Sequence, residues 1–232
     1  MVTLVQVIKL LWSSSIDNPV SFTGEHYNLT NAWIDQKPIA KPHPPIHVGA
    51  LGSNTALRIT AELGDGWQPF FSTPEYYTKR LNYLKEHTIN YGRDPKSIEP
   101  SVWVYMHITD DPIEAENLLR GLAVFCIAER GSLKHSGFDM SKLPSKEFHF
   151  ARLIINDSAR IEKLVEAAST IPLELVKKMH CVGTVNDVCS FFKTHIEAGV
   201  RHFLINPCVS PNPDSTLEIF SEKVIPQLKG KS

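Results

Sequence analysis

A glycine-rich turn is the part of this chain whose residue types and spacing could do chemistry. It follows an apolar stretch at residues 46–48, typical of a short buried parallel strand, and precedes a helical pattern that runs to about residue 63. Glycines let the backbone bend and approach a ligand, and N–H groups at the start of a helix bind anions, so the pattern predicts a phosphate site. An ordinary strand-to-helix turn is the alternative interpretation. The residues of the turn are Gly49, Ala50, Leu51, Gly52, Ser53, Asn54 and Thr55, of which the last three are candidate helix caps.

Histidine and cysteine residues form no metal-binding pattern in this sequence. His43 lies close to His47, and His180 precedes Cys181, but a metal site needs three or four ligands and neither pair supplies them. The sequence also has no Gly-x-Ser-x-Gly nucleophile motif and no evident pair of carboxylates with separate acid and base roles. We therefore predict no metal, and these patterns assign no catalytic residue.

Composition restricts the partners of the protein. The chain has 232 residues, of which 42% are apolar, enough to bury a sizeable core. Its 24 basic and 25 acidic residues give a formal net charge of −1 without a long run of like charge, which argues against nucleic acid or an anionic membrane surface. No apolar run reaches the roughly 20 residues that span a bilayer. A small-molecule substrate or a protein partner fits better.

The cysteines and the N-terminal residues indicate a compartment. The four cysteines form no Cys-x-x-Cys pair, and the first residues do not combine the basic, apolar and cleavage regions of a signal peptide. We therefore expect four reduced thiols in a cytoplasmic protein.

The elements that must position the turn alternate between strand and helix. Apolar patterns predict four buried strands near residues 46, 67, 103 and 204, each followed by a helix, and such alternation predicts a parallel sheet. A helical pattern over residues 2–12 comes first, without a strand of its own. A β-prone segment with Gly24 at its turn predicts a surface hairpin, and the looser pattern over residues 125–180 predicts a helical insertion.

Several helix ends can be predicted from local residue types. Thr73 precedes a proline and an acid, which predicts a helix start. Thr184 and Asp187 have the spacing of a capping box, and Ile196 is expected to be buried in the helix behind it. Asp214 is expected to cap the last helix.

Four segments of the chain resemble the luciferase-like monooxygenase superfamily, closest to its F420-dependent reductases and dehydrogenases, of the methylenetetrahydromethanopterin reductase kind. They are GEHYNL, QKPIAKPHPPIHVGALG, ALRITAELGDGWQPF, and VGTVNDV with EAGVRHFLI. The resemblance covers nearly all of residues 2–228 and implies the α/β class, a (β/α)8 TIM barrel whose strands five to eight are the four predicted here. Residues 1–232 then form a single luciferase-like domain that lacks the N-terminal half of the barrel.

The resemblance also implies a function. It points to an oxidoreductase that transfers a hydride between coenzyme F420 and a carbonyl, alcohol or pterin-type substrate. FMN is the alternative cofactor, and an FMN-dependent monooxygenase is the alternative enzyme. A non-catalytic half-barrel, as a fragment or a subunit, stays open too. A homo-oligomer, or a partner that supplies the missing half-barrel, is expected in either case.

The site implied by the resemblance lies at the carboxyl ends of the strands. The turn from Gly49 to Thr55 would line the isoalloxazine and phosphate end of the coenzyme. Two positions depart from the family: many relatives have proline where Ser53 stands, and the methanopterin reductases tend to have a polar residue where Leu51 stands, which weakens the pterin assignment. Active sites of barrels are built at the carboxyl ends of strands, which makes four further residues pocket candidates, each with a structural role as the alternative. They are Gln68, Phe70, His107 and Asn206.

Overall fold

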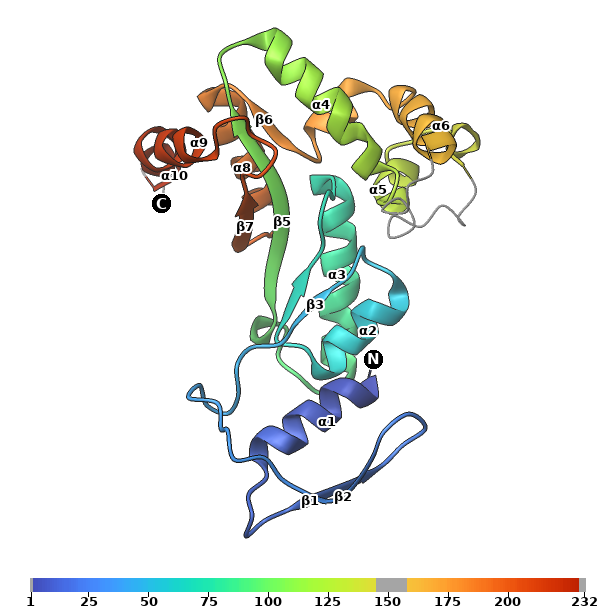
Figure 1. Ribbon diagram of the computed structural model, residues 1–232, viewed down its shortest axis with the longest axis vertical. Coiled ribbons are helices and arrows are strands. Elements are labelled where there is room, and N and C mark those ends of the chain that lie inside the picture. Colours follow the sequence, from blue (N-terminus) through green and yellow to red (C-terminus); the bar gives the residue numbers. More distant parts are fainter. Residues whose placement is uncertain (1, 145–157, 230–232) are drawn as a thin grey trace. The chain divides into compact units, whose positions relative to one another are not determined.

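The computed structural model describes residues 2–144 and 158–229, so residues 145–157 of the expected helical insertion lie outside the described residues. No helix in these ranges has both the length and the apolar composition needed to cross a bilayer. The helices and strands in chain order (Figure 1) are α1 (Val2–Ser13), β1 (Val20–Thr23), β2 (Asn28–Ala32), β3 (His47–Gly49), α2 (Asn54–Leu63), β4 (Gly66–Gln68), α3 (Pro74–Asn90), β5 (Glu99–Ile108), α4 (Pro112–Cys126), α5 (Arg130–His135), α6 (Ser158–Ser169), α7 (Leu173–Lys177), β6 (Cys181–Gly183), α8 (Val185–Glu197), β7 (His202–Asn206), α9 (Pro213–Ile219) and α10 (Ile225–Lys229).

One sheet contains the four predicted strands and a fifth. Its order is β3–β4–β5–β6, and β7 also pairs with β5. The ten-residue strand β5 pairs in parallel with β7 over residues 101–105 and with β6 over residues 106–108. The parallel pairing predicted from the alternation of strands and helices is therefore confirmed. The sequence analysis did not predict β6, whose residues Cys181–Gly183 directly follow the segment assigned to the helical insertion.

The chain separates into two compact units. Unit 1 comprises residues 1–48, 53–67 and 83–99, and unit 2 comprises residues 49–52, 68–82 and 100–232. The boundary passes through β3, β4 and β5, so the amino ends of these strands belong to unit 1 and their carboxyl ends to unit 2.

Unit 1 contains α1, the hairpin of β1 and β2, and α2. The two hairpin strands are antiparallel, as predicted for the segment around Gly24 (Figure 1). Helix α1 packs near α2, where the Lys9 ammonium donates a hydrogen bond to the Leu63 carbonyl at 2.7 Å. The Arg93 guanidinium donates to the carbonyls of Ala61 and Gly64 at 2.8 and 2.7 Å. These two cations satisfy carbonyl groups at the end of α2 that have no partner within the helix.

Unit 2 is built around β5 and the helices packed on it. Val102, Val104 and Met106 are at most 1% exposed, whereas Trp103 and Tyr105 between them are only partly buried, as expected for side chains that alternate between the two faces of a strand. Helix α4 packs against α6 and α7, and Figure 1 shows α4 and α6 beside each other. Their apolar side chains form one buried cluster with Phe71, Met179 and Val182, among others.

Most of the predicted helix ends are confirmed, and two expectations are wrong. The side chain of Thr184 accepts a hydrogen bond from the Asp187 N–H and the box is complete, as predicted. Asn212, not Asp214, caps α9, because Pro213 takes the first helical position and moves the cap upstream. Ile196 is 40% exposed, because the buried stripe of α8 continues through His195 and residue 196 lies one step, about 100°, further round the helix.

Candidate functional site

The predicted turn between β3 and α2 has the backbone geometry that a close ligand approach needs. Gly52 has φ +82°, in the left-handed region that favours glycine. A Cβ atom at Gly49 would meet no atom within 4 Å, so the space beside that residue is open. Ser53 caps α2, because its side chain accepts a hydrogen bond from the Ala56 N–H at 3.3 Å. Of the three candidate caps, the structure selects Ser53.

Unit 2 holds the four pocket candidates and the first part of the turn. Gln68 ends β4, Phe70 follows it by two residues, His107 is next to last in β5, and Asn206 ends β7. Because β5 runs parallel to β7, and Phe70 forms a parallel bridge with Trp103, these residues share the carboxyl edge of the sheet. Residues 49–52 belong to the same unit.

An aromatic surface accompanies Phe70 along β5. The ring of Phe70 packs edge-on against Trp103 with centroids 6.1 Å apart, and Trp103 lies 4.7 Å from Tyr105. All three side chains are only partly buried. Sequence reasoning missed Trp103 and Tyr105, although the alternation of β5 puts them on one face and the buried aliphatic residues on the other. Partly exposed, rigid rings of this kind can stack on a planar ligand.

His107 occupies a buried hydrogen-bond network. It is 5% exposed, and its Nδ1 lies 2.9 Å from the Ser210 hydroxyl, which in turn lies 2.9 Å from the Thr216 hydroxyl. Its Nε2 lies 3.5 Å from a carboxylate oxygen of Glu114. Through these contacts His107 links β5 to the start of α4 and to the loop after β7. Its role at the carboxyl edge of the sheet is therefore structural.

Asn206 organises the loop that follows β7. Its side-chain oxygen accepts a hydrogen bond from the Cys208 N–H at 2.9 Å, which closes a tight turn. Asn206 is the register partner of Tyr105 on β5. Burial raises the pKa of Tyr105, and the nearby Cys208 thiol raises it further, so the phenol stays protonated and can donate a hydrogen bond. The Cys208 thiol itself is exposed.

His43 and His47 each lie near one carboxylate group. His43 Nδ1 lies 3.8 Å from an Asp65 carboxylate oxygen, and His47 Nε2 lies 3.2 Å from one of Glu99. Over residues 2–144 and 158–229, no group of three or more His, Cys, Asp and Glu side chains is arranged to hold a metal ion.

Behind the aromatic surface, His180 lies in an apolar core. It is 1% exposed, its ring centroid is 4.8 Å from that of Phe71, and its Nε2 is 3.5 Å from the Cys126 sulfur. Burial lowers the pKa of His180 to about 3, against the opposing effect of the Leu122 carbonyl, and raises that of Cys126 to about 12. Both groups are therefore neutral at physiological pH, and the Cys126 thiol is not the thiolate that a nucleophile or a metal ligand requires.

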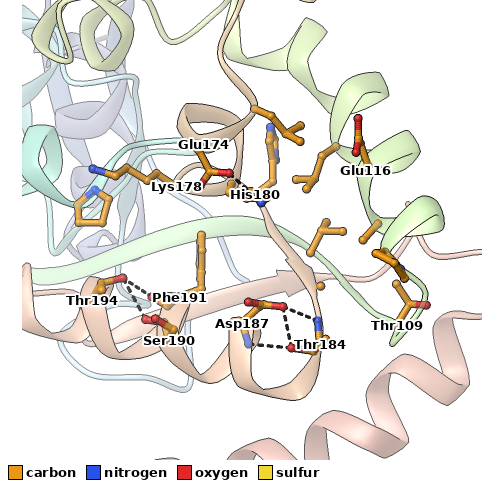
Figure 2. A pocket seen from close by; sticks show the side chains of 18 of the residues that line it. Thr109, Glu116, Glu174, Lys178, His180, Thr184, Asp187, Ser190, Phe191 and Thr194 are labelled. Carbon is orange, nitrogen blue, oxygen red and sulfur yellow. Dashed lines mark hydrogen bonds and ion pairs between the residues drawn. The ribbon is translucent and has the colours of Figure 1, made fainter.

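A pocket of about 760 Å³ lies elsewhere in unit 2, between α3, α4, α7 and α8. Figure 2 shows side chains that line the pocket, among them Thr184 and Asp187 of the capping box. Along α8, the Thr194 hydroxyl donates a hydrogen bond to the Ser190 carbonyl. Several of its charges are paired with each other, for example Lys178 with Glu75 at 2.6 Å. None of the predicted site residues lines this pocket, so the carboxyl edge of the sheet and the pocket are different features.

Comparison with known proteins places the chain in a family. The family model described as "Luciferase-like monooxygenase" matches residues 1–202. Among curated proteins, the chain is 26% identical over 231 residues to the F420-dependent glucose-6-phosphate dehydrogenase of Kineococcus radiotolerans, an alignment that covers 97% of this chain and 59% of the relative.

Solved structures agree on the fold. An F420-dependent secondary alcohol dehydrogenase in complex with an F420-acetone adduct matches with a TM-score of 0.73 at 20% identity, over 97% of this chain and 60% of that one. The coenzyme F420-dependent tetrahydromethanopterin reductase of Methanopyrus kandleri matches with a TM-score of 0.76 at 17% identity, over 97% and 63%. The chain thus spans about 60% of the length of these relatives.

Proposed function

The chain belongs to the luciferase-like monooxygenase family, and from this premise we propose that the protein is an oxidoreductase that transfers a hydride between coenzyme F420 and a carbonyl, alcohol or pterin-type substrate. One observation carries the proposal: unit 2 combines the open turn of residues 49–52 with a partly exposed aromatic surface at the carboxyl edge of parallel strands. The bound deazaflavin would accept a hydride from an alcohol or a reduced pterin, or donate one to a carbonyl. The identity of the cofactor is supported by the F420-dependent relatives.

The residues present fit such a cofactor. The turn has open space where a side chain at Gly49 would stand, so a phosphate can approach the backbone N–H groups of Gly49, Ala50, Leu51 and Gly52 in unit 2. Trp103 and Tyr105 offer flat surfaces and exclude water, and the Tyr105 phenol can donate a hydrogen bond to an anionic or carbonyl oxygen. Gln68 and Asn206 stand at the ends of their strands as polar contacts for a substrate.

The chain works together with further barrel strands in this proposal. Strand β7 has no fully buried residue although Phe203, Leu204 and Ile205 are apolar, and among the described residues it pairs with β5 alone. An apolar edge of this kind favours association. A second copy of the chain, or a partner that supplies the other half of a (β/α)8 domain, would cover it, and residues 125–180 would be an insertion in that single domain. We place the protein in the cytoplasm, in keeping with its four free thiols.

Hydride transfer separates the proposal from its rivals. The chain and any longer or partnered form of it are mixed anaerobically with oxidised F420 and secondary alcohols or reduced pterins, and separately with reduced F420 and carbonyl compounds. Substrate-dependent loss of the absorbance of oxidised F420 in the first mixtures, or its appearance in the second, supports the proposal. Oxygen consumption with reduced FMN, and none of the anaerobic reaction, would instead support the monooxygenase for which the family is named. If the chain and its longer or partnered forms bind the cofactor but catalyse neither reaction, the result would support a non-catalytic half-barrel.

A further inference from the structure

A buried arginine lies directly under the turn in unit 2. Arg80, on α3, is 9% exposed. A Cβ atom at Gly52 would lie 3.2 Å from Arg80 Cγ and 3.5 Å from its Nε, so the absence of a side chain at Gly52 is what allows the turn to rest on this arginine. Because the guanidinium is always charged, it places a permanent positive charge beside Gly52.

A buried carboxyl group interacts electrostatically with the same arginine. Glu129 precedes α5 and is 1% exposed. Its Oε1 accepts a hydrogen bond from the Ser132 N–H at 3.1 Å, whereas its Oε2 is buried without a hydrogen-bond partner among the described residues. Burial raises the pKa of Glu129 to about 8, against the opposing effects of the Ser132 and Gly131 N–H groups and of Arg80. Near neutral pH this carboxyl is therefore largely protonated.

The other groups that face Glu129 do not titrate in the same range. Burial raises the pKa of Tyr76, on α3, and the charge of Glu129 raises it further, while Arg80 lowers it. Burial raises the pKa of Cys126, at the end of α4, to about 12. Helix α5 contributes backbone N–H groups. Between about pH 7 and pH 9, Glu129 is thus the group of this cluster whose charge changes.

We propose that Arg80 is the positioning residue of an anion subsite at residues 49–52, and that ionisation of Glu129 weakens anion binding there. The inference rests on the proposed function, in which this turn receives the phosphate-bearing end of the cofactor. While Glu129 is protonated, it does not offset the positive charge of Arg80 beside Gly52, and the burial of both groups limits screening by salt. Once Glu129 ionises, its negative charge offsets that of Arg80 and repels the incoming phosphate.

Two variants with a control test the role of Arg80. We expect Arg80→Met to lose about tenfold or more in affinity for F420, the size of one charge-assisted interaction, and Arg80→Lys to keep most of that affinity. Both variants should bind the deazaflavin that lacks the phosphate group about as tightly as the unchanged chain does. Arg120→Met removes an exposed arginine from α4 and should bind both ligands as the unchanged chain does. Equal loss of both ligands in Arg80→Met, or no loss of F420, would overturn the inference.

The pH profile of anion binding tests Glu129 independently. Affinity for inorganic phosphate and for F420 should fall as the pH rises through about 8, beyond the change caused by ionisation of phosphate itself, and Glu129→Gln should bind without that fall. Parallel profiles of the two proteins would contradict the role of Glu129. Binding of phosphate that depends on Arg80, in a chain that does not bind F420, would defeat the proposed function and leave this inference standing. A chain that binds neither ligand would defeat both.

Discussion

Mild acid should destabilise unit 2 through its buried histidines. His180 is 1% exposed in a core of aromatic and sulfur groups, and burial lowers its pKa to about 3. In the unfolded chain the same imidazole would have a pKa of about 6.5. The unfolded state therefore binds a proton first as the pH falls. The stability contributed by neutral His180 is fully present above about pH 6.5 and is lost progressively below it, down to the folded pKa.

The size of the effect follows from these two pKa values. Between about pH 7 and about pH 5, protonation of His180 in the unfolded chain alone should lower the free energy of unfolding by about 2 kcal/mol. His195 adds to the effect in the same direction, because it is 1% exposed and burial lowers its pKa as well. A loss of this size is a large part of the stability of an ordinary domain.

Urea unfolding at the two pH values measures the loss. The variant His180→Phe, which keeps an aromatic ring in the core, should lose about 2 kcal/mol less than the unchanged chain on acidification. The exposed His26 provides a matched control, since His26→Phe should lose as much as the unchanged chain. If the unchanged chain and His180→Phe gave parallel pH profiles, a neutral, buried His180 would not be the cause and the reasoning would be refuted.

Four further outcomes are expected. Asp187→Ala breaks the capping box of α8 and should cost about 1 kcal/mol in urea unfolding, whereas Glu197→Ala at the other end of the helix should stay within about 0.5 kcal/mol; equal effects would deny the cap its role. Gly52→Ala puts a Cβ at φ +82° against Arg80 and should cost about 1–2 kcal/mol, with weaker phosphate binding; unchanged stability would show that the turn tolerates a side chain. Trp103→Ala should lower affinity for F420 in fluorescence titration by about tenfold, and an unchanged affinity would show that the Trp103 ring does not contact the cofactor. Ile205→Lys should shift the sedimentation of the chain toward the monomer, and an unchanged oligomer would exclude the β7 edge as the interface.

Features that depend on neighbouring residues were predicted well. The hairpin around Gly24, the glycine turn after β3, the capping box of α8 and the parallel pairing of β5 with β7 all agree with the structure. Each follows from turn chemistry, from a cap three residues away or from apolar periodicity. The errors were also local. The cap of α9 is Asn212, because Pro213 takes the first helical position, and Ile196 is exposed, because it lies one residue beyond the buried stripe of α8.

The contents of the candidate site were harder to predict. Gly49, Phe70 and Asn206 could be proposed from their positions at strand ends, but Trp103 and Tyr105 were overlooked although β5 alternates clearly. Arg80 and Glu129 could not have been found at all, since a charged residue in a helix or a loop is usually exposed. Their burial becomes visible only when α3, the turn and the start of α5 are placed in space.

The sequence by itself determined the order of the elements other than β6, the turn from Gly49 to Thr55 and the family resemblance, because these depend on residue types within short windows. Only the tertiary structure decided that His107 is held in a buried network and that the turn rests on Arg80. Contacts between segments far apart in the chain follow from how whole elements pack, and packing is a property of their combined shapes and not of any one segment.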